Sequence, residues 1–488
     1  MKNIIRELEK QLASKVGAYH YLIIPGLLLA VALTSRLYNL ANFPYFTNGW
    51  PMCGGFSCLG RSIQNPSLSG LYSDEVTDLL AAHPLSGIPL RIGSGPVALL
   101  LIALSTHVFG VTSFAVRFPF ALVSGITSVP LYFTAKLIAK SKTLAALSTL
   151  YFIVMMPALI YGRMAFAENI VALLFILVFY STLKIRESVL SGEQSSNRGW
   201  FLFASLCSIL SILVKINGII VFLFFVLFLF RVKLLRQGFR YIVFIFGLGI
   251  LPELAVVQLF TGHSIASFIS ALSANWIAPL GNSLNLPKFF LFDTLPSSGA
   301  PLFWGISGYP IPEFWYIFSY ITLVTIVTYD YLSHSSEYSD SNLLLLAIAG
   351  FAAFFIIFSE PFGAYWMIMI LPLLAISFGP GLKHLLLEMP LGIALSFYAF
   401  LFVPLAISLG MTLYTPTLLG DHTITNNILL LWNVLVVVPP AVVLFFTAKV
   451  NIKDSKWRIF SNGILLLAFF LVLILATFFV PDLYPYYI

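Results

Sequence analysis

The chain has few charged residues and few cysteines. Only 9% of its 488 residues are charged, against roughly 25% in a typical soluble domain. With 59% hydrophobic residues, the chain cannot enclose its apolar side chains in a polar surface, which excludes a soluble globular protein. Three cysteines are too few for a disulfide framework or a thiolate metal site. Also absent are internal repeats, a glycine-rich phosphate loop and a zinc motif.

Long apolar runs recur along the whole chain, and each approaches the length that crosses a bilayer. They predict an all-α polytopic membrane protein with about 13 transmembrane helices. The expected spans are residues 18–37, 113–135, 143–160, 168–184, 200–214, 216–231, 241–260, 312–330, 342–358, 365–380, 390–411, 427–447 and 460–480. One further run, "PVALLLIALSTHVFG", is short for a crossing and is expected to lie as a helix in the membrane interface.

The basic residues predict which ends of the spans face the cytoplasm. With a cytoplasmic N-terminus, residues 1–17 form an interfacial leader, and most of the 26 Lys and Arg residues fall in cytoplasmic loops. This placement beside the membrane also argues against a nucleic-acid partner. Two long outside loops are expected, over residues 38–112 and 261–311. The basic residues left on the outside half are Arg36, Arg61, Arg91, Arg117, Arg163, Lys215 and Lys288.

Four motifs occur in a characteristic order. "FGVTSFAVRFP" contains Arg117, "YGRMAFAEN" forms the next outside turn, "LVKINGI" surrounds Lys215, and "AYWMIMILPLLAI" contains Tyr365. Together they resemble the GT-C membrane glycosyltransferases, and most of all the protein O-mannosyltransferase and lipid A aminoarabinose transferase group. The resemblance implies a GT-C catalytic module over residues 18–380, with interfacial helices in its first outside loop. Residues 381–488 would add further C-terminal transmembrane helices.

The resemblance implies an integral protein of a prokaryotic plasma membrane. It would move one sugar from a polyprenyl-phosphate donor to a protein, lipid or glycan on the outer face, with inversion at the sugar carbon. A donor phosphate needs fixed positive charge, and arginine offers a fork that matches phosphate oxygens. The expected phosphate-binding residues are Arg61, Arg91, Arg117, Arg163 and Lys215, and Asn48 and Tyr365 are candidate substrate contacts. For each cation alone, a structural ion pair or an interfacial anchor is the alternative.

The catalytic base is the main departure from the family pattern. Inverting transfer needs a base for the acceptor proton, yet the family's aspartate aligns with Met52, and the amide of Asn48 cannot be a base. Asp74 or Glu75 could fold back to supply it. If no base is supplied, a protein that binds or flips a lipid-linked sugar is the alternative function.

Two further groups are candidates by analogy with the superfamily. Glu168 lies on an outside loop that contributes acidic residues to the active site in relatives, so it could ligate a metal or orient a substrate hydroxyl. A local pair between Arg163 and Glu168 is the simpler alternative. His83 and His263 could hold a divalent metal ion, although a loop histidine is more often only solvated.

Overall fold

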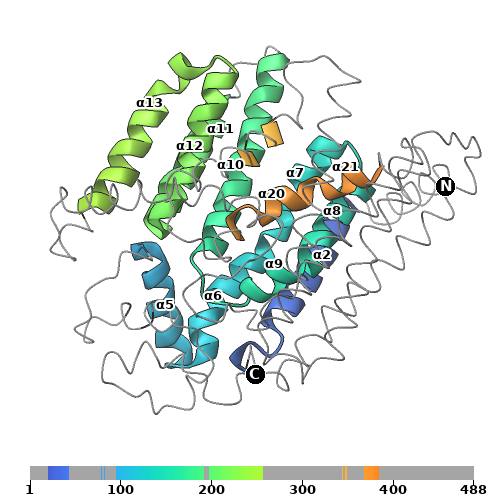
Figure 1. The fold of residues 1–488 in the computed structure, drawn as a ribbon, viewed down its shortest axis with the longest axis vertical. Coiled ribbons are helices and arrows are strands. Elements are labelled where there is room, and N and C mark those ends of the chain that lie inside the picture. Colours follow the sequence, from blue (N-terminus) through green and yellow to red (C-terminus); the bar gives the residue numbers. More distant parts are fainter. Residues whose placement is uncertain are drawn as a thin grey trace, which may run out of the picture.

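The computed structural model describes residues 20–42, 95–191, 197–255 and 368–383, together with residues 79, 82, 343, 344, 347 and 348. Every regular element within these residues is a helix (Figure 1). The elements are α2 (His20–Leu37), η2 (Leu40–Asn42), α5 (Pro96–Phe109), α6 (Ser113–Ile126), α7 (Ser128–Ala139), α8 (Lys142–Val154), α9 (Met156–Tyr161), α10 (Glu168–Leu190), α11 (Asn197–Val214), η7 (Ile216–Gly218), α12 (Ile219–Arg231), α13 (Leu235–Ile245), η8 (Phe246–Ile250), α20 (Leu371–Ile376) and α21 (Phe378–Lys383).

Within the described residues, four helical stretches are long and apolar enough to cross a membrane. They are Ser113–Ala139, Glu168–Leu190, Asn197–Val214 and Leu235–Ala255. Each overlaps one of the expected spans and differs from it by a few residues at its ends. The helical membrane fold is therefore confirmed over the described part of the chain. Most of the expected spans after residue 260 lie outside the described residues, so the total of about 13 stays a prediction.

Shorter apolar helices account for most of the other expected elements in the described part. α2 and α12 lie in the expected spans 18–37 and 216–231. The run that was expected to be an interfacial helix is indeed helical, as α5. α5 packs against α6 and α11, and the N–H of Gly95 just before it donates to the carbonyl of Val214 at 2.7 Å. The start of α5 is thereby fixed at the end of α11.

The expected span 143–160 is wrong as one continuous helix. α8 ends at Val154, Met155 has a non-helical ψ of 118°, and a new helix, α9, begins at Met156. Pro157 explains the break, because proline has no N–H to donate to the carbonyl four residues earlier, that of Ile153. The chain then passes through residues 162–167 into α10.

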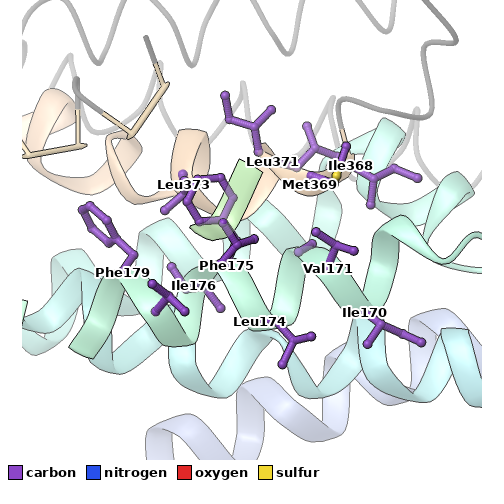
Figure 2. Close-up of a cluster of buried hydrophobic side chains, with 14 of the residues drawn as sticks. Ile170, Val171, Leu174, Phe175, Ile176, Phe179, Ile368, Met369, Leu371 and Leu373 are labelled. Atoms are coloured by element: carbon purple, nitrogen blue, oxygen red, sulfur yellow. The ribbon is translucent and has the colours of Figure 1, made fainter. Parts of the chain in front are cut away.

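α10 lies at the centre of the described helices, in contact with α6, α7, α11 and α12 (Figure 1). Its apolar side chains meet those of the segment before and within α20. Figure 2 shows Val171 and Phe175 of α10 facing Met369 and Leu371, and all four are fully buried. α10 is therefore held in place by apolar packing along much of its length.

α20 and α21 are tied to α8 by polar and aromatic contacts. The hydroxyl of Ser148 donates to the carbonyl of Ile376 at 3.1 Å and accepts from the N–H of Gly379 at 2.9 Å. The rings of Tyr151 and Phe378 stack with centroids 4.2 Å apart. Since α8 and α21 are more than 200 residues apart in sequence, these contacts close the described helices into one packed unit.

Candidate functional site

Glu168 and Lys215 form an ion pair where α10 begins and α11 ends. The Nζ atom of Lys215 lies 2.5 Å from Oε1 of Glu168. The side chain of Glu168 is fully buried and that of Lys215 is only 13% exposed. Both residues were expected at the site, but the sequence suggested no contact between them. We call the end of the bundle that holds this pair the site end.

The positions of the two charges suit the helix dipoles. Glu168 is the first residue of α10, where the unpaired N–H groups carry partial positive charge. Lys215 directly follows Val214, the last residue of α11, where the terminal carbonyls carry partial negative charge. Each charge is therefore stabilised both by its partner and by its own helix end.

A tight turn places Lys215. The N–H of Gly218 donates to the carbonyl of Lys215 at 2.7 Å, and the hydroxyl of Ser211 donates to the carbonyl of Gly218 at 2.9 Å. A Cβ on Gly218 would lie 2.0 Å from the carbonyl oxygen of Ser211, so only glycine allows the chain to come this close. The turn holds the lysine backbone at the junction of α11 and α12.

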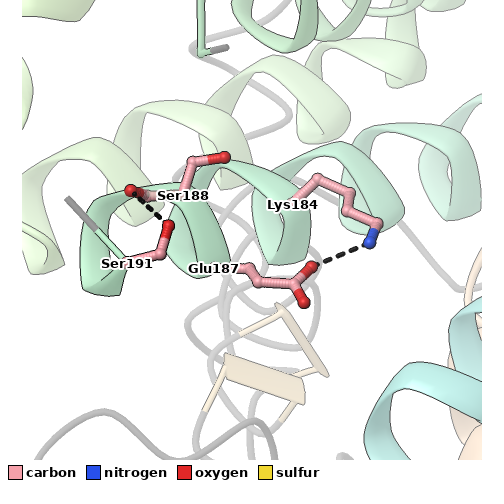
Figure 3. Close-up of polar contacts among 4 residues, drawn as sticks. All are labelled: Lys184, Glu187, Ser188 and Ser191. Carbon is pink, nitrogen blue, oxygen red and sulfur yellow. Dashed lines mark hydrogen bonds and ion pairs between the residues drawn. The ribbon is translucent and has the colours of Figure 1, made fainter. Parts of the chain in front are cut away.

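A second ion pair, which lies wholly on α10, shows how unusual the burial of the Glu168–Lys215 pair is. Lys184 Nζ lies 2.7 Å from Oε2 of Glu187, near the opposite end of the same helix (Figure 3). Glu187 is 64% exposed, and exposed pairs contribute about 0–1 kcal/mol. Removing one partner of a buried pair costs far more, roughly 3–5 kcal/mol, because a charge stays buried and uncompensated. Oε2 of Glu168 is also buried and has no hydrogen-bond partner among the described residues.

Residues 162–167, between α9 and α10, are all buried. The side-chain amide of Asn169 donates to the carbonyls of Tyr161 at 2.9 Å and of Met164 at 3.2 Å, which fixes the path of this segment. Within it, Nη2 of Arg163 donates to the carbonyl of Tyr38. Arg163 is thus hydrogen-bonded to the residue that follows α2. The alternative from the sequence was a local ion pair between Arg163 and Glu168.

Two more arginines are fully buried near the site end. Arg117 lies in the second turn of α6 and is 0% exposed, and α6 packs against α10, α2 and α5. Arg36 lies in the last turn of α2 and is also 0% exposed. Arg36 was expected only as one of the outside cations, and no role was predicted for it.

The sequence analysis did not single out Asn169, and it assigned no role to Arg36. Asn169 follows Glu168 directly, and an asparagine in the first turn of an apolar helix is a signal for local backbone bonds. Arg36 gave a weaker signal, because one arginine at the end of a span is common as an interfacial anchor.

The other predicted site residues lie outside the described residues. They are Asn48, Arg61, Asp74, Glu75, His83, Arg91, His263 and Tyr365, and Met52 lies outside them as well. The long outside loop 261–311 and the C-terminal region 381–488 lie almost wholly outside them too. Within the described ranges, no group of three or more His, Cys, Asp or Glu side chains could hold a metal ion. The expected ligands His83 and His263 lie outside these ranges, so the metal site stays a prediction.

Residues 93–256 match the family model for dolichyl-phosphate-mannose-protein mannosyltransferase. This stretch contains Arg117, Arg163, Glu168 and Lys215, all the predicted site residues that the structure describes. The expected resemblance to the GT-C glycosyltransferases is confirmed. Among curated proteins, none matches this chain.

The comparison with solved structures found matches that cover most of this chain. ArnT from Cupriavidus metallidurans in the apo state has a TM-score of 0.51 at 13% identity, over 92% of this chain and 75% of ArnT. ArnT bound to undecaprenyl phosphate has a TM-score of 0.49 at 15% identity, over 94% and 77%. The apo oligosaccharyltransferase of Archaeoglobus fulgidus has a TM-score of 0.45 at 15% identity, over 91% of this chain and 57% of that one. At this identity, the match to apo ArnT shows the GT-C-type fold and no more.

Proposed function

We propose that this protein is a membrane glycosyltransferase that transfers one sugar from a polyprenyl-phosphate donor to an acceptor at the outer face of the membrane. The acceptor is a protein, a lipid or a glycan. Two findings support the proposal together: the mannosyltransferase family match over residues 93–256, and the cationic residues that this stretch brings to the site end.

The observation that carries the proposal is the buried pair of Glu168 and Lys215. A lysine at a helix end in a membrane protein is expected to reach toward water, but this one is held inward by a fully buried carboxylate. Such pairing of intramembrane charge is typical of functional sites. We assign Glu168 to hold the Lys215 ammonium in place, since its burial leaves the carboxylate no exposed oxygen for an acceptor.

In the proposed reaction, an acceptor hydroxyl attacks the anomeric carbon of the sugar. The bond from that carbon to the phosphate oxygen breaks, and polyprenyl phosphate leaves with the bonding electrons. Lys215 and Arg163 would stabilise the charge that develops on the phosphate, because preorganised cations in a dry site act strongly on it. Arg117 is fully buried, so it would act on the phosphate only through its charge. Arg61 and Arg91 are further candidates for this role from the sequence.

The proton of the acceptor hydroxyl must pass to a base as the new bond forms. Asp74 and Glu75 are the proposed bases, because they are the first acids after Glu9 in the sequence. Inversion at the sugar carbon follows from a single displacement on the face opposite the phosphate. Substitution of Asp74 and of Glu75, singly and together, identifies which of them accepts the proton.

The deciding experiment measures transfer by the purified protein in liposomes. Radiolabelled polyprenyl-phosphate mannose and glucose are the donors, with a crude membrane-lipid and glycan fraction as acceptor, and release of polyprenyl phosphate is followed. Replacing Lys215 by methionine is expected to lower the transfer rate roughly 100-fold, as loss of one preorganised charge does. Glu168→Gln is expected to lower it as well, because the ammonium is then no longer held.

The control is the exposed pair of Lys184 and Glu187 near the other end of α10. Lys184→Met and Glu187→Gln each remove one charge of the same sign as Lys215→Met and Glu168→Gln, but from an exposed pair. Both variants should transfer sugar at the wild-type rate. Equal rates for Lys215→Met and Lys184→Met would contradict the assigned site. Absence of transfer from both donors, with intact donor binding, favours the alternative function.

That alternative is a protein that binds or flips a lipid-linked sugar. One observation favours it: Met52 stands where the family pattern has its catalytic aspartate. Such a protein keeps the cationic site and binds the donor but does not release polyprenyl phosphate. The same liposome assay separates the two functions, because binding and release are measured in one sample.

A further inference from the structure

Arg36 makes more interactions than any role as a membrane anchor requires. Its Nε donates to the hydroxyl of Ser124 at 3.3 Å, and its Nη1 donates to the carbonyl of Ile153 at 3.0 Å and to the hydroxyl of Ser35 at 3.3 Å. Nη2 donates to the carbonyl of Phe152 at 3.4 Å. The guanidinium also lies over the ring of Phe152 at 5.8 Å. All its hydrogen-bond acceptors among the described residues are neutral.

Two of these acceptors are carbonyls that the break between α8 and α9 leaves without a donor from their own helix. The carbonyl of Ile153 would accept from the N–H four residues later, but that residue is Pro157, which has none. The carbonyl of Phe152 belongs to the last turn of α8, where helix carbonyls have no intrahelical donor. Arg36 of α2 therefore caps a helix more than 100 residues away in sequence.

Arg36 also lies against the start of the segment 162–167. A Cβ on Gly162 would lie 2.8 Å from Nε of Arg36 and 2.4 Å from the hydroxyl of Ser124. No larger residue fits there without a shift of the arginine. Gly162 directly precedes Arg163, and Arg163 donates to Tyr38, two residues after Arg36. The end of α2 thus lies against this segment at Gly162 and accepts a hydrogen bond from it at Arg163.

We propose that Arg36 is a positioning residue that sets the path of residues 162–167 and so the placement of Arg163 and Glu168. Its relevance to sugar transfer rests on the proposed function. Arginine suits the task because its planar guanidinium offers five donors in fixed directions, and here they serve α6, α8 and α2 together. Lysine carries one ammonium with three donors and cannot bridge the same set of acceptors.

The first test measures amide hydrogen exchange and needs no ligand. The amides of Gly162, Met164 and Asn169 are hydrogen-bonded within or beside the segment. Arg36→Met should raise their exchange rates about tenfold through local opening, while amides in the middle of α10 keep their wild-type rates. Arg36→Lys should give an intermediate increase. Arg240→Met, at an exposed arginine bonded to Tyr241, is the matched control and should change neither set.

A general loss of stability would raise exchange in the middle of α10 as much as in the segment, and that outcome overturns the proposal. So does unchanged exchange in the segment of a folded Arg36→Met protein. If Arg36→Met does not fold, Ser124→Ala takes its place. It removes the acceptor of Nε and keeps the guanidinium, so a smaller local increase is expected, and no increase overturns the proposal.

The second test measures binding of undecaprenyl phosphate, the lipid present in one ArnT structure. Arg36→Met and Arg163→Met should each weaken binding by a similar factor, and the double variant should bind no more weakly than either one, because Arg36 acts on the phosphate through the placement of Arg163. Additive losses overturn the positioning role. If the wild-type protein does not bind this lipid, the proposed function fails, and the exchange data still decide whether Arg36 orders the segment.

Discussion

At the residue scale, the buried charges decide how the site end is built. Glu168 is fully buried beside Lys215, whereas Arg36 is fully buried among carbonyls and hydroxyls. A buried carboxylate with one ammonium partner depends on that partner, because few other groups offset the loss of its hydration. A buried guanidinium can spread its charge over several neutral acceptors. Charge removal is therefore expected to be most harmful at the pair.

Lys215→Met is predicted to lower the free energy of unfolding by roughly 3–5 kcal/mol, because it leaves the Glu168 carboxylate buried without its partner. The double variant Lys215→Met with Glu168→Gln should recover part of this loss, since the buried charge is then removed. Lys184→Met should cost at most about 1 kcal/mol. Thermal unfolding in detergent, followed by circular dichroism, measures all three. Equal losses for Lys215→Met and Lys184→Met would show that the buried pair does not stabilise the fold.

At the element scale, the turn between α11 and α12 positions the lysine, and Gly218 makes this turn possible. Gly218→Ala is predicted to destabilise the protein by about 1–3 kcal/mol, because the new Cβ overlaps the backbone carbonyl of Ser211. Gly199→Ala in the first turn of α11 meets nothing within 4 Å and should not destabilise, since alanine favours helix over glycine. Unfolding midpoints of the two variants provide the comparison, and an equally tolerated Gly218→Ala would refute the tight turn.

The same elements show what the sequence could and could not predict. The spans around α2, α6, α10 and α11 follow from apolar length alone, so their positions were predicted to within a few residues. The break at Pro157 was missed because the apolar run continues through it, and hydropathy carries no information about a single missing N–H.

The contacts at the site were harder to predict than the elements. Topology placed Glu168 at the start of one expected span and Lys215 directly after the end of the next, and so near the same membrane face. It did not determine their pairing, which depends on how α10 and α11 rotate against each other. Rotation is set by side-chain packing that span prediction does not contain. The acceptors of Arg36 depend in the same way on how α2, α6 and α8 pack.

At the scale of the whole molecule, the two ends of α10 are expected to lie on opposite sides of the membrane. The helix has 23 residues, and at about 1.5 Å per residue it is long enough to cross the hydrocarbon core. Glu168 marks its site end, and Lys184, Arg186 and Glu187 lie toward the other. Basic residues concentrate at that other end, also in α7 and α8, which is the pattern of a cytoplasmic face.

Cysteine labelling tests this orientation. In a variant with Cys53, Cys58 and Cys207 replaced, a single cysteine is introduced at Val111, between α5 and α6, or at Ser191, directly after α10; both positions are exposed. A membrane-impermeant maleimide should label position 111 in intact spheroplasts and position 191 only after lysis, if the site end faces outward as proposed. Labelling of both positions from one side would mean that α10 does not cross the membrane. Labelling in the reverse order would put the Glu168–Lys215 pair on the cytoplasmic face, and a donor in the outer leaflet could then not reach Lys215.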